Sequence, residues 1–305
     1  MQRYVFLLLT SISWAAAPQV EIRSNEVWLL KDGEARQLTS DGKSKLQAVL
    51  SPSENQIAYY DQCPQAENCT PSIIILDREG HRLKTFQPMA QADSLAEPCG
   101  SILDIFWVTE TSIGAECHGN PSLSEYVETD LVSGKTVRDL LGLGFTPSPD
   151  RKYVAHIGPI VHFAAPIYQS YYLYIDKTVV YPLPRGMRPS EKEPQVVRRR
   201  GSTWIGVHEF VPEFSWSPDS ERIAFVDCLF DWIEKGVGDD GATPIGDMTN
   251  RRCFVAVVAR TGRAALFPIS TSEVDANAVS FKWDSPTQLS TQVAGTSRKF
   301  TIPKN

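Results

Sequence analysis

The 305-residue sequence predicts an all-β protein made of repeated four-stranded units. Three observations support this fold class. A strand–turn–strand motif recurs along the chain, a second hairpin follows every copy except the last, and 42% hydrophobic and 22% charged residues are typical of a globular protein. Repeated units can hold a chain of this length in one fold, because each unit packs its faces against its neighbours.

The N-terminal residues have the pattern of a secretory signal (1–15). Arg3 supplies the positive end, Tyr4–Ile12 the apolar stretch and Ser13–Ala15 the small-x-small cleavage pattern. We expect cleavage after Ala15 and export to the periplasm or out of the cell. An uncleaved N-terminal strand is the alternative. The apolar run is too short to span a bilayer, so no membrane span is expected.

A Ser-Pro turn marks the first hairpin of four units and is missing from the copy at Ile105–Ala115. In each clear copy a strand leads into the turn, and an apolar strand with an early Ala follows. Proline presets φ at the second position of such a turn, and Asp or Ser caps it through the side chain. The three clear copies and two weaker ones are Leu50–Tyr60, Pro147–His156, Trp216–Val226, Phe281–Ser290 and Ile105–Ala115.

The second hairpins have β-rich runs around turns such as Asp-Gly and Ser-Gly, which are strong hairpin signals. They lie at Val27–Thr39, Ser72–Phe86, Glu125–Val137, Tyr171–Tyr181 and Phe254–Pro268. Five hairpins of each kind predict five units, and six is the alternative if residues 185–209 hide a degenerate one. The unmatched hairpins at the two ends predict a ring that is closed by the N-terminal strands joining the last unit. Arg298–Ile302 is expected to add a further strand there.

These repeats resemble those of TolB-type β-propellers. The resemblance rests on the block from Lys31 to Ala58 and on Trp216–Val226, and it extends over most of residues 26–290. It implies one propeller domain at 16–305, with insertions at 185–209 and 229–252 and without TolB's N-terminal α/β domain. The chain departs from the family pattern at the turn, where Arg151 and Ser220 follow the Asp in place of Gly, and Ser53-Glu54 replaces the pair.

Six cysteines in an exported chain predict disulfides. Their places in the repeats favour three local bridges, and the last is expected to staple the base of a loop at Leu229–Arg252. One free, buried pair is the alternative. The expected bridges are Cys63–Cys69, Cys99–Cys117 and Cys228–Cys253.

No catalytic, metal or cofactor site is predicted. The chain has no G-x-S-x-G nucleophile elbow. His156 and His162 match no metal-ligand template and are expected to be structural or exposed. Asp239 and Asp240 adjoin, whereas the acids of a calcium loop alternate. A net charge of −6 also argues against nucleic-acid binding.

The insertion at 185–209 is the candidate binding segment. It is basic in an acidic protein, and basic and aromatic residues on a loop suit an anionic or glycan ligand. The alternative is a solvated loop that packs its Trp against the rim. The candidate binding residues here are Arg198, Arg199, Arg200, Trp204 and His208.

Two functional classes follow. The first is a monomeric periplasmic or extracellular binding module, whose partner is an envelope or extracellular protein or an anionic or glycan ligand. The alternative is a propeller enzyme, a glycan hydrolase or lyase, with its site at the mouth of the central channel. On the predicted innermost strands, Asp104 and Glu213 are the acid pair that could meet there.

Overall fold

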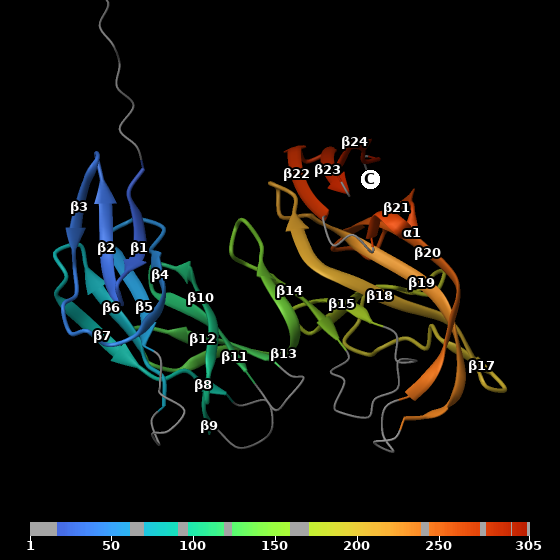
Figure 1. Ribbon diagram of the computed structural model, residues 1–305, viewed down its shortest axis with the longest axis horizontal. Coiled ribbons are helices and arrows are strands. Elements are labelled where there is room, and N and C mark those ends of the chain that lie inside the picture. The colour runs from blue at the N-terminus through green and yellow to red at the C-terminus, as the bar shows by residue number, and fades with distance from the viewer. Residues whose placement is uncertain are drawn as a thin grey trace, which may run out of the picture. The chain divides into compact units, whose positions relative to one another are not determined.

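The computed structural model describes residues 17–61, 70–90, 97–118, 124–158, 171–238, 244–274, 279–293 and 295–303. The chain forms two compact units, Met1–Phe86 and Gln87–Asn305, which are described separately (Figure 1). The signal segment lies outside the described residues and stays a prediction. The described residues are almost entirely antiparallel strands, which confirms the all-β class.

The first unit contains two antiparallel sheets. One has three strands and the other four, each in sequence order. The four-stranded sheet matches the predicted first unit, whereas the strand at Gln19–Arg23 was not predicted. The strands are β1 (Gln19–Arg23), β2 (Glu26–Lys31), β3 (Glu34–Gln37), β4 (Lys45–Leu50), β5 (Gln56–Asp61), β6 (Ile73–Asp77) and β7 (Arg82–Phe86). The core between them consists of Val27, Leu29, Leu38, Ile57, Tyr59, Ile74 and Leu76.

The second unit begins with a small pair, β8 (Met89–Ala90) and β9 (Glu97–Pro98), and a seven-stranded sheet. That sheet consists of β10 (Ile102–Thr109), β11 (Ser112–His118), β12 (Ser124–Asp130), β13 (Thr136–Pro147), β14 (Val154–Gly158), β15 (Tyr172–Ile175) and β16 (Thr178–Tyr181). The long β13 pairs with β12 along its first part and with β14 along its second. Two predicted four-stranded repeats therefore share one continuous strand, and the separate strands expected there are merged.

The rest of the second unit holds a five-stranded sheet, a one-turn helix and a three-stranded sheet. These are β17 (Arg198–Arg200), β18 (Thr203–Trp216), β19 (Arg222–Val237), β20 (Pro244–Ala259), β21 (Ala264–Ile269), α1 (Thr271–Val274), β22 (Val279–Ser285), β23 (Gln288–Val293) and β24 (Thr296–Thr301). The further strand expected at Arg298–Ile302 is confirmed by β24. The number of repeats and the closure of the ring stay predictions.

The Ser-Pro turns are built around a buried serine. Ser148 Oγ accepts a hydrogen bond from the backbone N–H of Tyr153 at 3.1 Å and donates one to Asp150 at 2.7 Å. Ser217 makes the same pair of bonds with Arg222, at 2.9 Å, and with Asp219, at 2.5 Å. The repeat motif is therefore a hydrogen-bonded turn that joins two consecutive antiparallel strands, β13 to β14 at Ser148 and β18 to β19 at Ser217.

The departures from the family's glycine fall on a strained position of this turn. Glu54, Arg151 and Ser220 have φ of 60°, 62° and 60°, in the left-handed region. A residue with a Cβ is disfavoured there by about 1–2 kcal/mol. Ser220 has a compensating contact, because its Oγ accepts a hydrogen bond from the Asp150 backbone N–H at 3.1 Å and so links two turns.

Replacing Arg151 by Gly is expected to stabilise the protein by about 0.5–1 kcal/mol, because Arg151 is exposed and its φ is positive. The matched control is Lys152→Gly in the same turn, where φ is not positive and added chain freedom should lower stability. Urea unfolding measures both variants. A less stable Arg151→Gly protein would contradict the strain argument.

Neighbouring sheets in the second unit pack through both faces. Ala155 and Phe225 belong to one core cluster, and Ala224 and Leu289 to the next. Trp216 of β18 donates its indole N–H to the carbonyl of Thr146 in β13 at 2.8 Å. The recurring alanines Ala58, Ala155 and Ala224 all have 0% exposure, as their repeated position predicted.

Replacing Ala224 by Leu should overpack the contact between the β18–β21 and β22–β24 sheets and cost about 1–3 kcal/mol. The control is Ala35→Leu, at an exposed position of β3, which should change stability by less than about 0.5 kcal/mol. Thermal unfolding of the two variants compares these sites. An unchanged melting temperature for Ala224→Leu would show that the two sheets are not closely packed at this site.

His156 lies inside a row of aromatic rings in the second unit. Its ring centroid is 5.2 Å from that of Phe145 and 5.1 Å from that of Tyr174, and its Nε2–H donates to the Asp176 carbonyl at 2.8 Å. Burial lowers the pKa of His156 from 6.5 to about 4. The structural interpretation of His156 is confirmed, and His162 lies outside the described residues.

The lowered pKa makes stability depend on pH. The unfolded chain takes up a proton at His156 near pH 6.5, and the folded chain does so only near pH 4. The contribution of neutral, buried His156 to the free energy of unfolding is therefore fully present above pH 6.5. It is lost as pH falls toward 4, by roughly 3 kcal/mol. Urea unfolding of the wild type and His156→Gln across this window should show a smaller acid loss in the variant. Parallel curves would refute this assignment.

Candidate functional site

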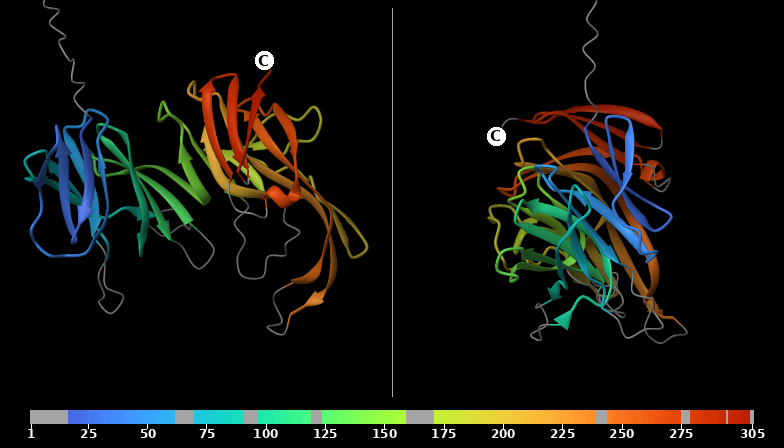
Figure 2. Two further views of the ribbon diagram at one scale, coloured as in Figure 1. Left: turned by 45° about the horizontal axis from the view of Figure 1, so that its top comes forward. Right: turned by 90° about the vertical axis from the view of Figure 1, so that its left-hand side faces the viewer.

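Strands β18, β19 and β20 run well past their neighbour β21. Residues 244–252 of β20 pair only with β19. Residues 203–205 of β18 pair with β19 on one side and with β17 on the other. This distal part, named here the β17–β20 extension, comprises residues 198–208, 229–237 and 244–252. It lies at the lower right in Figure 1 and in the left view of Figure 2.

The extension joins the two insertions that the sequence predicts separately. The segment expected to be a loop at Leu229–Arg252 consists largely of paired strands, because β19 continues to Val237 and β20 starts at Pro244. Its strands pair with residues of the other insertion, at Arg198–His208. The loop expectation is therefore wrong for the described part of this segment.

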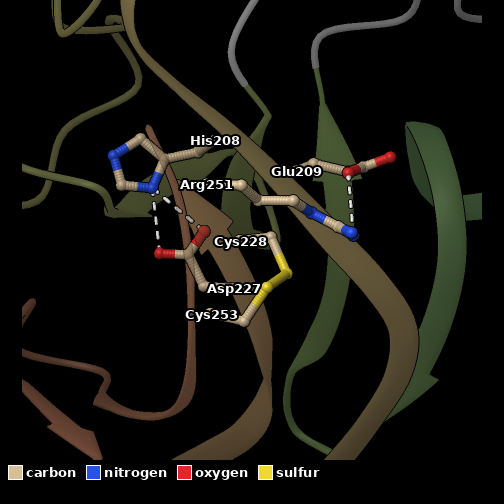
Figure 3. Close-up of a disulfide and its surroundings, with 6 residues drawn as sticks. All are labelled: His208, Glu209, Asp227, Cys228, Arg251 and Cys253. Atoms are coloured by element: carbon tan, nitrogen blue, oxygen red, sulfur yellow. Dashed lines mark hydrogen bonds and ion pairs between the residues drawn. A yellow bond between two sulfur atoms is a disulfide. The ribbon is translucent and has the colours of Figure 1, made fainter. Parts of the chain in front are cut away.

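A disulfide lies at the base of the extension (Figure 3). Cys228 and Cys253 are direct partners in the β19–β20 ladder, are both buried, and form the expected bridge. Arg251 Nη2 lies 3.9 Å from Glu209 Oε2 beside it. The expected Cys99–Cys117 bridge is also present. The bridge expected between Cys63 and Cys69 lies outside the described residues.

The three arginines of β17 point to opposite faces of the extension, because side chains alternate along a strand. The Arg199 guanidinium carbon lies 4.7 Å from the ring centroid of Trp204. Its Nη2 is 3.4 Å from Glu234 Oε2, and the Trp204 indole N–H donates to the same oxygen at 3.4 Å. The Arg199 guanidinium group is thus paired with side chains of the same chain, and its neighbours Arg198 and Arg200 lie on the other face.

The face that carries Arg199 is the covered face. A buried cluster lies on it, with Phe230 at 3% and Trp232 at 7% exposure, and Trp204 packs at its margin. Gly246 is required beside this cluster, because a Cβ there would lie 2.6 Å from the Trp232 ring. Ligand stacking on Trp204 stays a prediction. The cluster consists of Val197, Val207, Phe230 and Trp232, with Val196 and Trp204 packed against it.

The opposite side is the open face, and its side chains are exposed or half-buried. It consists of Arg198, Arg200, Thr203, Ile205, Asp231, Ile233, Lys235, Ile245, Asp247 and Thr249. Ile205 and Ile245 are 38% and 50% exposed. Lys235 pairs with Asp247 at 2.5 Å, whereas Arg198 and Arg200 have no ion pair among the described residues. The open face thus combines apolar side chains with two unneutralised guanidinium groups.

His208 lies where the extension meets the main sheet. Its Nδ1 is 2.9 Å from Oδ2 and 3.0 Å from Oδ1 of Asp227, which is 1% exposed, and the Tyr181 hydroxyl donates to Oδ2 at 2.6 Å. Burial, together with the Asp227 carboxylate, raises the pKa of Tyr181, so its hydroxyl stays a donor. These contacts tie β16, β18 and β19 together. Asp227 and Tyr181 were not predicted.

The predicted acid pair of the channel mouth is only partly described. Asp104 lies in β10 opposite Glu116 of β11. Burial, with the nearby charge of Asp104, raises the pKa of Glu116. Glu213 lies in β18, where the ladder shifts register between Val211 and Ser215, and its side chain is outside the described residues. A meeting of Asp104 and Glu213 stays a prediction.

A cavity of about 100 Å³ lies between β19, β20, β21 and the residues after β24. This volume is well below the roughly 300–1,000 Å³ of small-molecule sites. Three or more potential metal ligands do not come together anywhere in the described residues. The same residues contain no helix long and apolar enough to cross a membrane.

No protein-family model and no curated protein matches this chain. Similar solved structures include TolB from Acinetobacter baumannii, at 15% identity and a TM-score of 0.35, covering 92% of this chain. A putative TolB from Agrobacterium tumefaciens has 10% identity and a TM-score of 0.36, covering 85% of this chain and 91% of that one. The β-propeller domain of the Trilobed protease from Pyrococcus furiosus has 11% identity and a TM-score of 0.39, covering 96% and 99%.

TolB structures are thus among those similar to this chain, as the resemblance of the repeats predicts. The chain spans 60% of the length of the TolB from Acinetobacter baumannii. At such low identities and TM-scores, these similarities assign no function to the chain.

Proposed function

We propose that this chain is an exported binding module and that it recognises its partner with the open face of the β17–β20 extension. The observation that carries the proposal is the pairing state of the arginines. Arg199 is neutralised by Glu234, whereas Arg198 and Arg200 are exposed without an ion pair among the described residues. Such free guanidinium groups suit a carboxylate or another anion.

Apolar exposure on the same face favours a protein partner. Ile205 and Ile245 present their side chains there, and Val237 at the tip is 60% exposed. Aliphatic groups beside arginine are typical of interfaces, where the apolar part supplies affinity and the charge supplies orientation. The partner class is therefore an anionic envelope or extracellular protein, with an anionic glycan as the alternative ligand.

Export is supported by the two described disulfides, because such bonds persist mainly in oxidising compartments. The same proposal includes a single propeller domain from residue 16 onward. Its ring would close through the edges of the β1–β3 and β22–β24 sheets, each of which has three strands, one fewer than the β4–β7 sheet. We propose five repeats, with six as the alternative if residues 185–209 hide a degenerate one.

The test compares two double variants with the same change of charge. Arg198→Gln with Arg200→Gln removes both free guanidinium groups, and Lys152→Gln with Lys177→Gln removes two exposed charges away from the extension. Each immobilised mature chain captures proteins from envelope extract, which are identified by mass spectrometry. We expect a specific, salt-sensitive partner to be lost only by the arginine variant.

Both double variants should keep the melting temperature, because exposed charges contribute only about 0–1 kcal/mol each. Equal capture of the same proteins by both variants would contradict the proposed surface. A loss of capture by both would assign recognition to net charge and not to the extension.

A further inference from the structure

We propose that the open edge of β17 accepts an acidic segment of the partner as an added β-strand, with carboxylates at alternate positions facing Arg198 and Arg200. This inference rests on the proposed function and specifies the partner's conformation. It follows from the spacing of the two arginines, from the free strand edge and from the positive charges beside that edge.

The spacing of the arginines matches a strand. Arg198 and Arg200 are two residues apart on β17 and share the open face, so their Cα atoms are about 6.6–7 Å apart. An extended partner repeats its side chains on one face at the same interval. Two acids separated by one residue would therefore lie directly opposite the two guanidinium groups, where opposite charges attract across a ladder.

The edge that would receive this strand is open. β17 is the outermost strand of its sheet and pairs only with β18 among the described strands. Residues Gly201 and Ser202 form the tight turn that follows it, so Arg200 and Thr203 are the closing pair. Hydrogen bonding alternates along an antiparallel ladder, and we therefore expect the N–H and C=O of Arg199 to face outward.

Charge decides which strands can use this edge. Consecutive arginines repel a second copy of β17 and so disfavour edge-to-edge aggregation of this chain. An acidic strand meets the same edge with attraction. Because only about one residue of β17 offers outward backbone groups, the guanidinium contacts must supply most of the selectivity, and binding should weaken as salt screens them.

The probes are two fluorescent peptides of one composition, Thr-Glu-Val-Glu-Thr and Thr-Glu-Glu-Val-Thr, with capped ends. Fluorescence anisotropy with the mature chain, at low and at physiological ionic strength, should show that the alternating peptide binds about fivefold more tightly. N-methylation of its central valine blocks pairing with Arg199 and should remove this preference. Polygalacturonate serves as a glycan competitor.

Arg198→Gln and Arg200→Gln should each weaken the alternating peptide by about fivefold and abolish the preference between isomers. The matched control is Lys177→Gln, which removes an exposed charge away from the extension and should leave affinity unchanged. Melting temperatures verify that each variant is folded.

The two isomers could bind equally well, with binding lost when Arg198 or Arg200 is replaced. That result would overturn strand addition but would still support an anion-binding surface. Binding of polygalacturonate but of neither peptide would replace the acidic strand with a glycan. Absence of binding by every probe would overturn the inference, and the capture experiment would still decide the proposed function by itself.

Discussion

The need to cover both faces of the sheet that contains β19 governs the packing of this structure. A strand such as β19 is apolar on both sides along its first half, where Ile223 and Phe225 face one neighbouring sheet and Ala224 and Val226 the other. Neither face tolerates water, so each sheet depends on the sheets beside it. The recurring alanines follow from this close stacking, because a larger side chain would push two sheets apart.

The extension begins where that covering ends. Past Cys228 the same strand changes to a pattern with one apolar side, where Phe230 and Trp232 are buried and Asp231 and Ile233 lie on the open face. In the extension, only the covered face is buried by residues of this chain. Asp227 marks the transition, since its buried carboxylate is satisfied by Tyr181 and His208 in place of apolar packing.

Much of the fold was predictable because the signals are local. The Ser-Pro turns indicate the strands on either side of them, and the recurring Ala identifies the buried positions. The extension was missed because Arg198–His208 and Leu229–Asn250 pair at the far end of a long ladder, and the Ser-Pro turn at Ser217 does not indicate how far the ladder continues. The buried carboxylate of Asp227 was missed because both of its partners lie far from it in the chain.

The candidate site shows what a charge pattern leaves undetermined. Three adjacent arginines suggest one basic patch, and that interpretation holds only if the segment is a loop. In a strand, side chains alternate between the two faces, so Arg199 contacts Glu234 and Trp204. Arg198 and Arg200 then lie on the open face. The number of available charges, their spacing and the strand edge beside them then all follow from a single structural assignment. The partner's chemistry is therefore constrained by secondary structure, which the composition of the segment could not reveal.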